Sequence, residues 1–104
     1  MRGSDLCRRA EKYINSKWPG SYVINIIVSG KSGDSDIVAS IEGVFCSFEI
    51  KGEGDTIKEL QIDKIRKVLR SKGRAGVVRR LSDIDDIVKG SQSKLDYKSK
   101  RLSL

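Results

Sequence analysis

The sequence predicts an α/β fold in which a small mixed β-sheet is flanked by helices, in the element order α-β-β-β-α-β-α. Three observations favour this class. Two long segments carry apolar residues at helical spacing, short β-branched and aromatic runs lie between and after them, and Gly, Pro, Ser and Asp separate the runs. With 104 residues the chain has the length of one domain, which we expect over residues 1–90, followed by a basic polar tail over residues 91–104.

The N-terminal third is expected to contain one helix and one strand. Residues 4–18 predict the helix, because Ser4 can cap it, its apolar residues follow helical spacing, and Pro19-Gly20 can end it. The run Tyr22–Val28 is β-branched and aromatic and therefore predicts a strand. The Gly, Ser and Asp residues within 29–35 predict a loop.

The remaining elements begin with a hairpin. Strands are expected over residues 36–41 and 44–51, around the two-residue turn Glu42-Gly43. A helix is expected over residues 56–72, because Thr56 and Glu59 have capping-box spacing, Gly73 can serve as its C′ residue, and an apolar stripe is formed by Ile57, Leu60, Ile65, Val68 and Leu69. A short strand over residues 75–78 and a helix over residues 82–89, ended by Gly90, complete the domain.

Composition narrows the classes of function. The net charge of +7 favours a polyanionic partner, nucleic acid first and an anionic membrane surface second. The chain contains no His, so Ser-His-Asp and Cys-His catalysis are excluded, as are zinc sites that need imidazole. Catalysis would have to use carboxylates, Lys, Tyr or a hard metal ion. Cys7 and Cys46 lack ligand spacing and are expected to be reduced and partly buried.

The sequence gives no sign of a membrane segment. The longest apolar run is far too short to span a bilayer, and the N-terminus lacks an apolar signal core. We therefore expect a protein of a cytosol-like compartment, which would be the host cytoplasm for a protein encoded by a phage.

The hairpin predicts a pair of neighbouring carboxylates. If Glu42-Gly43 is a two-residue turn, Ile41 faces Val44 and Asp36 falls directly opposite Glu49, with Cβ atoms roughly 4.5–5.5 Å apart. Strand alternation puts Lys51 on the same face as Glu49. Two such carboxylates can bind a divalent metal ion through oxygen ligands. The alternative is a solvated hairpin end in which Lys51 neutralises Glu49.

Two more polar residues occupy positions that should face inward. Gln61 lies four residues from both Ile57 and Ile65, within the apolar stripe of its helix. It could point at a metal-bound water or a phosphate, or be a core Gln bonded to the backbone. Glu11 shares a helix line with Cys7, and its alternative is a solvated carboxylate at the helix edge.

These residues resemble the PD-(D/E)xK nuclease superfamily and, within it, the virus-type replication-repair nuclease (VRR-NUC) domain. The resemblance covers roughly residues 11–88. It rests on Glu11, on Gly33-Asp34-Ser35-Asp36-Ile37, on Phe48-Glu49-Ile50-Lys51, on Gln61, and on the closing segment GRAGVVRRLSDIDDIV. Ser35 stands where the family usually has Pro. The resemblance implies a restriction-endonuclease-like core and Mg²⁺- or Mn²⁺-dependent hydrolysis of phosphodiester bonds in DNA.

The resemblance also implies roles for individual residues. Asp36 and Glu49 would hold the metal ion, with the Ile50 carbonyl as a further ligand and Glu11 at a second ion or its water shell. Lys51 would orient or deprotonate the attacking water or stabilise the transition state, and Gln61 would position that water or Lys51. Small stand-alone members resemble Holliday-junction resolvases and act as homodimers, so branched DNA and a second copy are the implied partners.

Basic side chains in the C-terminal half are expected to contact the DNA backbone. Such contacts carry no sequence information, so we expect selectivity for DNA shape. The candidates are Lys58, Arg66, Lys67, Arg70, Lys72, Arg74, Arg79 and Arg80. Two alternatives stay open: a non-catalytic nucleic-acid-binding module with a vestigial acidic pair, and a subunit that cleaves only when a replication or repair partner delivers it.

Overall fold

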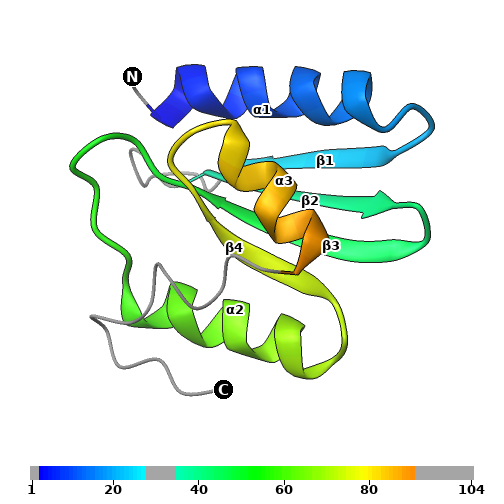
Figure 1. Cartoon of the computed structure of the whole chain (residues 1–104). Coiled ribbons are helices and arrows are strands. Elements are labelled where there is room, and N and C mark those ends of the chain that lie inside the picture. The colour runs from blue at the N-terminus through cyan, green and yellow to red at the C-terminus, as the bar shows by residue number, and fades with distance from the viewer. Residues whose placement is uncertain (1–2, 28–34, 91–104) are drawn as a thin grey trace.

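The computed structural model describes residues 3–27 and 35–90 and shows the predicted order of elements (Figure 1). The elements are α1 (Gly3–Lys17), β1 (Tyr22–Ile27), β2 (Ser35–Ile41), β3 (Val44–Ile50), α2 (Glu59–Arg70), β4 (Arg74–Val78) and α3 (Ser82–Lys89). The predicted α/β class is therefore confirmed. The tail over residues 91–104, most of the predicted loop, and Val28 at the end of the first predicted strand lie outside the described residues.

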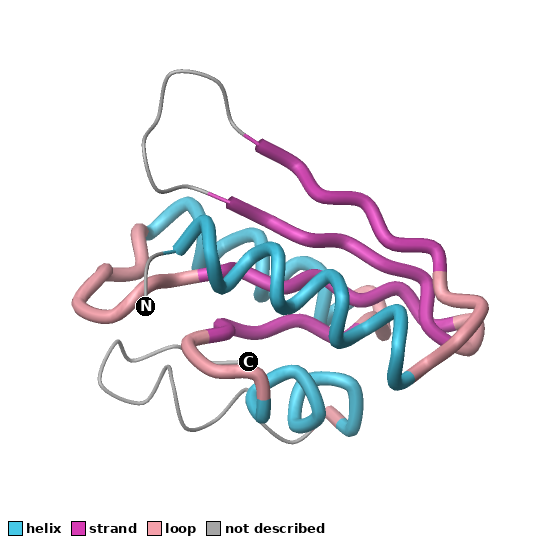
Figure 2. The backbone as a smooth tube through the Cα atoms, turned by 90° about the horizontal axis from the view of Figure 1, so that it is seen from above, coloured by secondary structure: helices cyan, strands magenta, loops and turns pink. Residues whose placement is uncertain are grey.

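The four strands form one mixed sheet in the order β1-β2-β3-β4. β1 pairs with β2 and β2 with β3 in antiparallel fashion, whereas β3 and β4 are parallel. A parallel pair needs a crossover connection, and α2 supplies it between β3 and β4. Figure 2 shows the strands side by side, with β1 on the outer edge of the sheet.

Helices cover the two faces of the sheet unequally. α1 and α3 pack on one face, where side chains such as Ile14, Phe48 and Ile84 are completely buried in the larger core. α2 lies on the opposite side of the sheet from α1 (Figure 1) and forms a smaller core in which Ile65 contacts Val77 and its neighbours. Among the described residues, no helix covers β1 and β2 comparably on that second face, and Ile24 and Ile26 are exposed there.

The turn between β2 and β3 sets the register of the hairpin. Glu42 and Gly43 both have positive φ, 52° and 83°, as a type I′ turn requires. The pairing then runs from Ile41 opposite Val44 to Asp36 opposite Glu49. This is the predicted register, and it is confirmed residue by residue.

Several predicted helix boundaries were wrong. α1 begins at Gly3, so Ser4 lies inside the helix and cannot be its cap. α2 begins at Glu59 and not at Thr56, with Lys58 as its N-cap residue. The side-chain oxygen of Gln61 accepts a hydrogen bond from the Lys58 amide at 2.9 Å, which ties down the first turn of α2.

The end and the apolar face of α2 also differ from the prediction. Lys72, with φ 76°, is the C′ residue, and Gly73 is one position further, where its amide donates to the carbonyl of Val68. Leu60, which the sequence assigned to the apolar stripe, is 81% exposed, and Ile62 is buried in the core in its place. The helix therefore presents a face rotated from the predicted one.

The two cysteines agree with the prediction, since Cys7 and Cys46 are both buried and do not form a disulfide with each other. Burial raises the pKa of the Cys46 thiol to about 11. Within residues 3–27 and 35–90, no helix has the length and apolar character needed to cross a membrane.

Candidate metal centre

The two predicted carboxylates lie side by side on the sheet face that α2 covers. Asp36 is near the beginning of β2, and Glu49 is directly opposite it near the end of β3. Their environments differ, because the side chain of Glu49 is 0% exposed whereas that of Asp36 is 16% exposed. A buried carboxylate therefore sits beside one that solvent can reach.

A lysine that the sequence analysis did not single out contacts both carboxylates. Lys64 projects from the middle of α2, and its ammonium group pairs with Asp36 Oδ2. The same nitrogen lies 3.2 Å from Glu49 Oε1 and 3.3 Å from Oε2. Helical spacing offered a signal, since Lys64 lies three residues after Gln61 and next to Ile65 on the face that meets the sheet.

The electrostatics of the pair follow from this arrangement. Burial, followed by the hydrogen bond and the charge of Asp36, raises the pKa of Glu49 to about 8, although Lys64 works in the opposite direction. Burial disfavours the charged form of Lys64, but the hydrogen bond to Asp36 and the charge of Glu49 outweigh it and raise the pKa of Lys64. At neutral pH the centre therefore contains a charged ammonium group and a Glu49 carboxyl group whose ionisation is disfavoured.

The donor atoms of this centre fit a hard divalent cation. Glu49 Oε1 is buried and accepts no hydrogen bond from the described residues, although Lys64 Nζ lies 3.2 Å from it as an ion-pair contact. Asp36 supplies a second carboxylate next to it, and Mg²⁺ in proteins is typically held by one or two carboxylates together with water and phosphate oxygens. No group of three or more acidic, His or Cys side chains suited to a metal occurs in the described ranges.

Lys51 follows directly after β3, and its amide donates to the carbonyl of Val78 at 2.9 Å. Its side chain is only 3% exposed. The alternative of a solvated hairpin end is therefore wrong, because both Glu49 and Lys51 are buried. The Ile50 side chain is fully buried as well, with the residue paired to Ser35 and Val78.

The other two predicted site residues, Gln61 and Glu11, have hydrogen-bond partners outside the acidic pair. The amide oxygen of Gln61 accepts a backbone hydrogen bond at the start of α2, as the second alternative expected, but the residue is half-buried and does not lie in the core. Glu11 is half-buried on α1 and accepts a hydrogen bond from Asn25 at 3.5 Å. Because Asn25 pairs with Ile37, the neighbour of Asp36, it points to the opposite sheet face from Asp36.

The predicted basic residues divide into two groups. Arg74 and Arg79 are half-buried and donate to backbone carbonyls, those of Val88 at 3.3 Å and Gly52 at 3.2 Å, which gives them structural contacts. Arg80 is exposed near Asp83. Those on or beside α2 form the outward-facing set: Lys58, Lys67, Arg70 and Lys72 are exposed, and Arg66 is half-buried.

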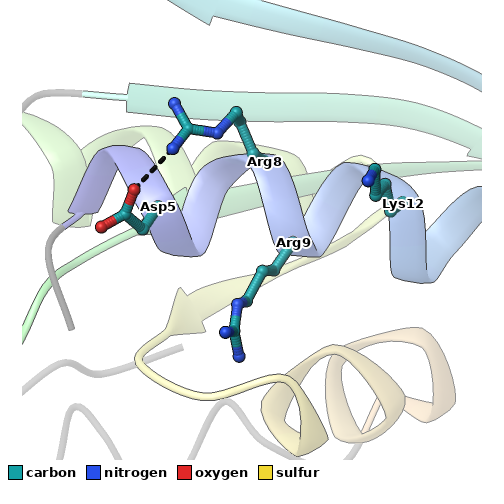
Figure 3. A pocket seen from close by; sticks show the side chains of 4 residues that line it. All are labelled: Asp5, Arg8, Arg9 and Lys12. Atoms are coloured by element: carbon teal, nitrogen blue, oxygen red, sulfur yellow. Dashed lines mark hydrogen bonds and ion pairs between the residues drawn. The ribbon is translucent and has the colours of Figure 1, made fainter.

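A second basic area lies on α1, which the sequence analysis did not consider. A shallow hollow there is lined by Asp5, Arg8, Arg9 and Lys12, and Arg8 forms an ion pair of 2.6 Å with Asp5 (Figure 3). Since α1 covers the sheet face opposite the acidic pair, this hollow is separate from the candidate metal centre.

The described residues thus form the small mixed α/β domain that the sequence predicted, with the acidic pair on one face of its sheet. The chain is similar to a solved VRR_NUC domain, with a TM-score of 0.56 and 19% sequence identity, over 86% of this chain and 97% of that one. The resemblance to VRR-NUC is thus confirmed for the fold. Neither a protein-family model nor a curated protein sequence matches the chain.

Proposed function

We propose that this protein is a divalent-metal-dependent endonuclease that hydrolyses phosphodiester bonds in DNA. The observation that carries the proposal is the juxtaposition of Asp36 and Glu49 on one sheet face, within a fold similar to that of a VRR_NUC domain. Two carboxyl groups in direct opposition disfavour each other's ionisation, and a cation held between them favours the ionised form of both.

Asp36 and Glu49 are the proposed ligands of Mg²⁺ or Mn²⁺, and the Ile50 carbonyl is a further candidate. When bound, the ion would supply Lewis-acid stabilisation of charge on the scissile phosphate and activation of a water molecule. Glu49 has to give up its proton to act as a ligand, because a metal binds the ionised carboxylate. Ion binding is therefore expected to release a proton at neutral pH.

Lys51 is the proposed catalytic cation. It lies two residues beyond Glu49, and as a buried ammonium group it would interact strongly with developing negative charge, because few water molecules screen it. Orienting or deprotonating the attacking water is the other role open to it. Gln61 and Glu11 remain predicted positioning residues, the first for the water and the second for an additional ion.

The exposed cations of α2 are the proposed contacts to the DNA backbone. Lys67, Arg70 and Lys72 cluster toward its C-terminal end, on the helix that also supplies Lys64 to the acidic pair. Phosphate contacts of this kind position the duplex without reading bases, so the proposed enzyme selects DNA by shape.

A four-way junction is the proposed substrate, and a homodimer the proposed active form, because paired opposed cuts need two centres related by a two-fold axis. The outer strand supports this proposal. Within residues 3–27 and 35–90, no strand pairs with the outer edge of β1, and on the sheet face of Asp36 the residues Tyr22, Ile24 and Ile26 are 70%, 42% and 41% exposed. A second copy placed against this strand would cover both the edge of β1 and these exposed side chains. A cytosol-like compartment is the proposed location.

One observation favours the second candidate, a non-catalytic nucleic-acid-binding module. The ammonium group of Lys64 already neutralises the acidic pair, so the pair can persist without a metal ion. A subunit that cleaves only when delivered by a replication or repair partner is a variant of the first proposal.

A nicking assay separates these functions. The purified protein is incubated with a four-way junction, a flap and a linear duplex, each with Mg²⁺ and with EDTA. We expect Mg²⁺-dependent cleavage with the junction preferred, and paired nicks placed symmetrically across it. Tight binding with no cleavage of any substrate in Mg²⁺ or Mn²⁺ would replace the endonuclease with the binding module. Cleavage by a protein that light scattering shows to be monomeric would remove the dimer and the paired cutting of junctions, and would leave the endonuclease.

A further inference from the structure

Lys64 occupies the position that a metal ion shared by the two carboxylates would take. It is the residue of α2 whose cationic group reaches the sheet between Asp36 and Glu49, and it contacts oxygens of both. A divalent cation shared by the two carboxylates would need the same oxygens and the same space. The ammonium group and the ion are therefore competitors for one site.

The burial of the three side chains differs in a way that permits exchange. Glu49 is fixed in the interior at 0% exposure, whereas the side chain of Lys64 is 40% exposed. A lysine has a flexible four-carbon stem, so its charged end can turn outward to solvent while the stem stays packed. The carboxylates form the rigid part of the centre and Lys64 forms the movable part.

We propose that Lys64 is the resident counter-ion of the acidic pair, holding Asp36 and Glu49 together when no metal ion is present and leaving them when the ion enters. The inference rests on the proposed function. Once released, the ammonium group stands on the helix that carries the exposed cations Lys67 and Arg70, where a DNA phosphate can take it as a new partner. Metal loading would then add a DNA contact to the α2 surface.

The exchange has a thermodynamic signature that a merely structural lysine lacks. Without metal, removing Lys64 leaves two carboxylates facing each other, so the protein is destabilised. When metal is added, the variant without Lys64 has no ammonium group that competes for the carboxylates, so it binds the ion more tightly than wild type does. One substitution is thus expected to lower stability in EDTA and to raise metal affinity, two effects of opposite sign.

The test compares wild type with Lys64→Met, which keeps the stem and removes the charge, and with Lys89→Met, at an exposed lysine of α3, as the control. Mg²⁺ binding is measured by titration calorimetry and by the rise in melting temperature. The measurements are made at pH 9, above the pKa of about 8 of Glu49 in wild type, to limit the cost of deprotonating this ligand. We expect Lys64→Met to bind Mg²⁺ about tenfold more tightly, a change that corresponds to about 1.4 kcal/mol, and Lys89→Met to match wild type.

A second measurement covers the case in which Lys64→Met folds poorly. In EDTA at pH 9, where Glu49 of wild type is ionised, the loss of stability caused by Lys64→Gln is measured in the wild-type background and in Glu49→Gln. A counter-ion predicts a clearly smaller loss in Glu49→Gln, because the charge that it balances is gone. Equal losses in the two backgrounds would overturn the counter-ion role.

The outcomes distinguish the inference from the function on which it rests. Mg²⁺ binding by wild type that is equal to or tighter than that of Lys64→Met would overturn the exchange and leave the endonuclease proposal intact. Binding by Lys64→Met alone would support the exchange while refuting metal-dependent catalysis by the wild type. Absence of Mg²⁺ and Mn²⁺ binding in both proteins would overturn both proposals.

Discussion

Replacing Glu49 by Gln should change how the stability of the metal-free protein depends on pH. The folded state raises the pKa of Glu49 from its ordinary value of 4.5 to about 8, through burial first and the neighbouring Asp36 second. Between these values the folded protein keeps a proton that the unfolded chain has lost. The free energy of unfolding therefore falls by about 1.4 kcal/mol for each pH unit in this interval, or about 3–5 kcal/mol in total. The contribution of Glu49 to the free energy of unfolding is fully present below pH 4.5 and is lost as the pH rises through 8.

Urea denaturation in EDTA at a series of pH values from 5 to 8.5 measures the effect. Because Gln does not titrate, the stability of Glu49→Gln minus that of wild type should grow by about 3–5 kcal/mol across the series, while titrations elsewhere cancel in the difference. Glu59→Gln, at an exposed glutamate of α2, is the control and should give a flat difference. If the difference for Glu49→Gln is equally flat, Glu49 does not titrate as a buried carboxyl, and the electrostatic account of the centre is refuted.

Three further outcomes are expected. Mg²⁺ should raise the melting temperature of wild type by binding the folded state, and Asp36→Asn should lose most of that rise; an equal rise in both proteins would contradict a shared site. Lys51→Ala should abolish cleavage while gel-shift measurements give a DNA affinity within a few-fold of wild type, and near-normal cleavage would remove Lys51 from the mechanism. The logarithm of DNA affinity should fall linearly with the logarithm of salt concentration, by about 0.9 per contacted phosphate, and replacing Lys67 and Arg70 together should flatten that slope more than removing equal charge from α1.

The fold could be predicted because its strongest signals are local. A turn that accepts positive φ at Glu42 and Gly43 fixes the register of a hairpin, and strand alternation then assigns every side chain to a face, so the opposition of Asp36 and Glu49 followed from simple counting. The last helix ends at Gly90, whose φ of 81° is the left-handed conformation that favours glycine.

The errors arose where a helix meets the sheet. Capping spacing at Thr56 and Glu59 competed with the Lys58–Gln61 contact two residues later, and the second start was the real one. The face that α2 presents to the sheet leaves Leu60 in solvent and carries Lys64 toward the acids. A charged residue beside an apolar stripe is usually solvated. The sequence position of Lys64 therefore did not show that two carboxylates far away in the sequence, on β2 and β3, would be its partners.

The turn at Glu42-Gly43 lies five residue pairs away from Asp36 and Glu49, roughly 17 Å along the strands. Its length nevertheless decides whether the two acids meet. One residue added to this turn would slip the pairing by one position and send one acid to the far face of the sheet, although every ligand remained in the sequence. The spacing across the turn is therefore as much a part of the centre as the acids themselves. Homologous chains that keep the acids but change the length of this turn should be read as having lost the site.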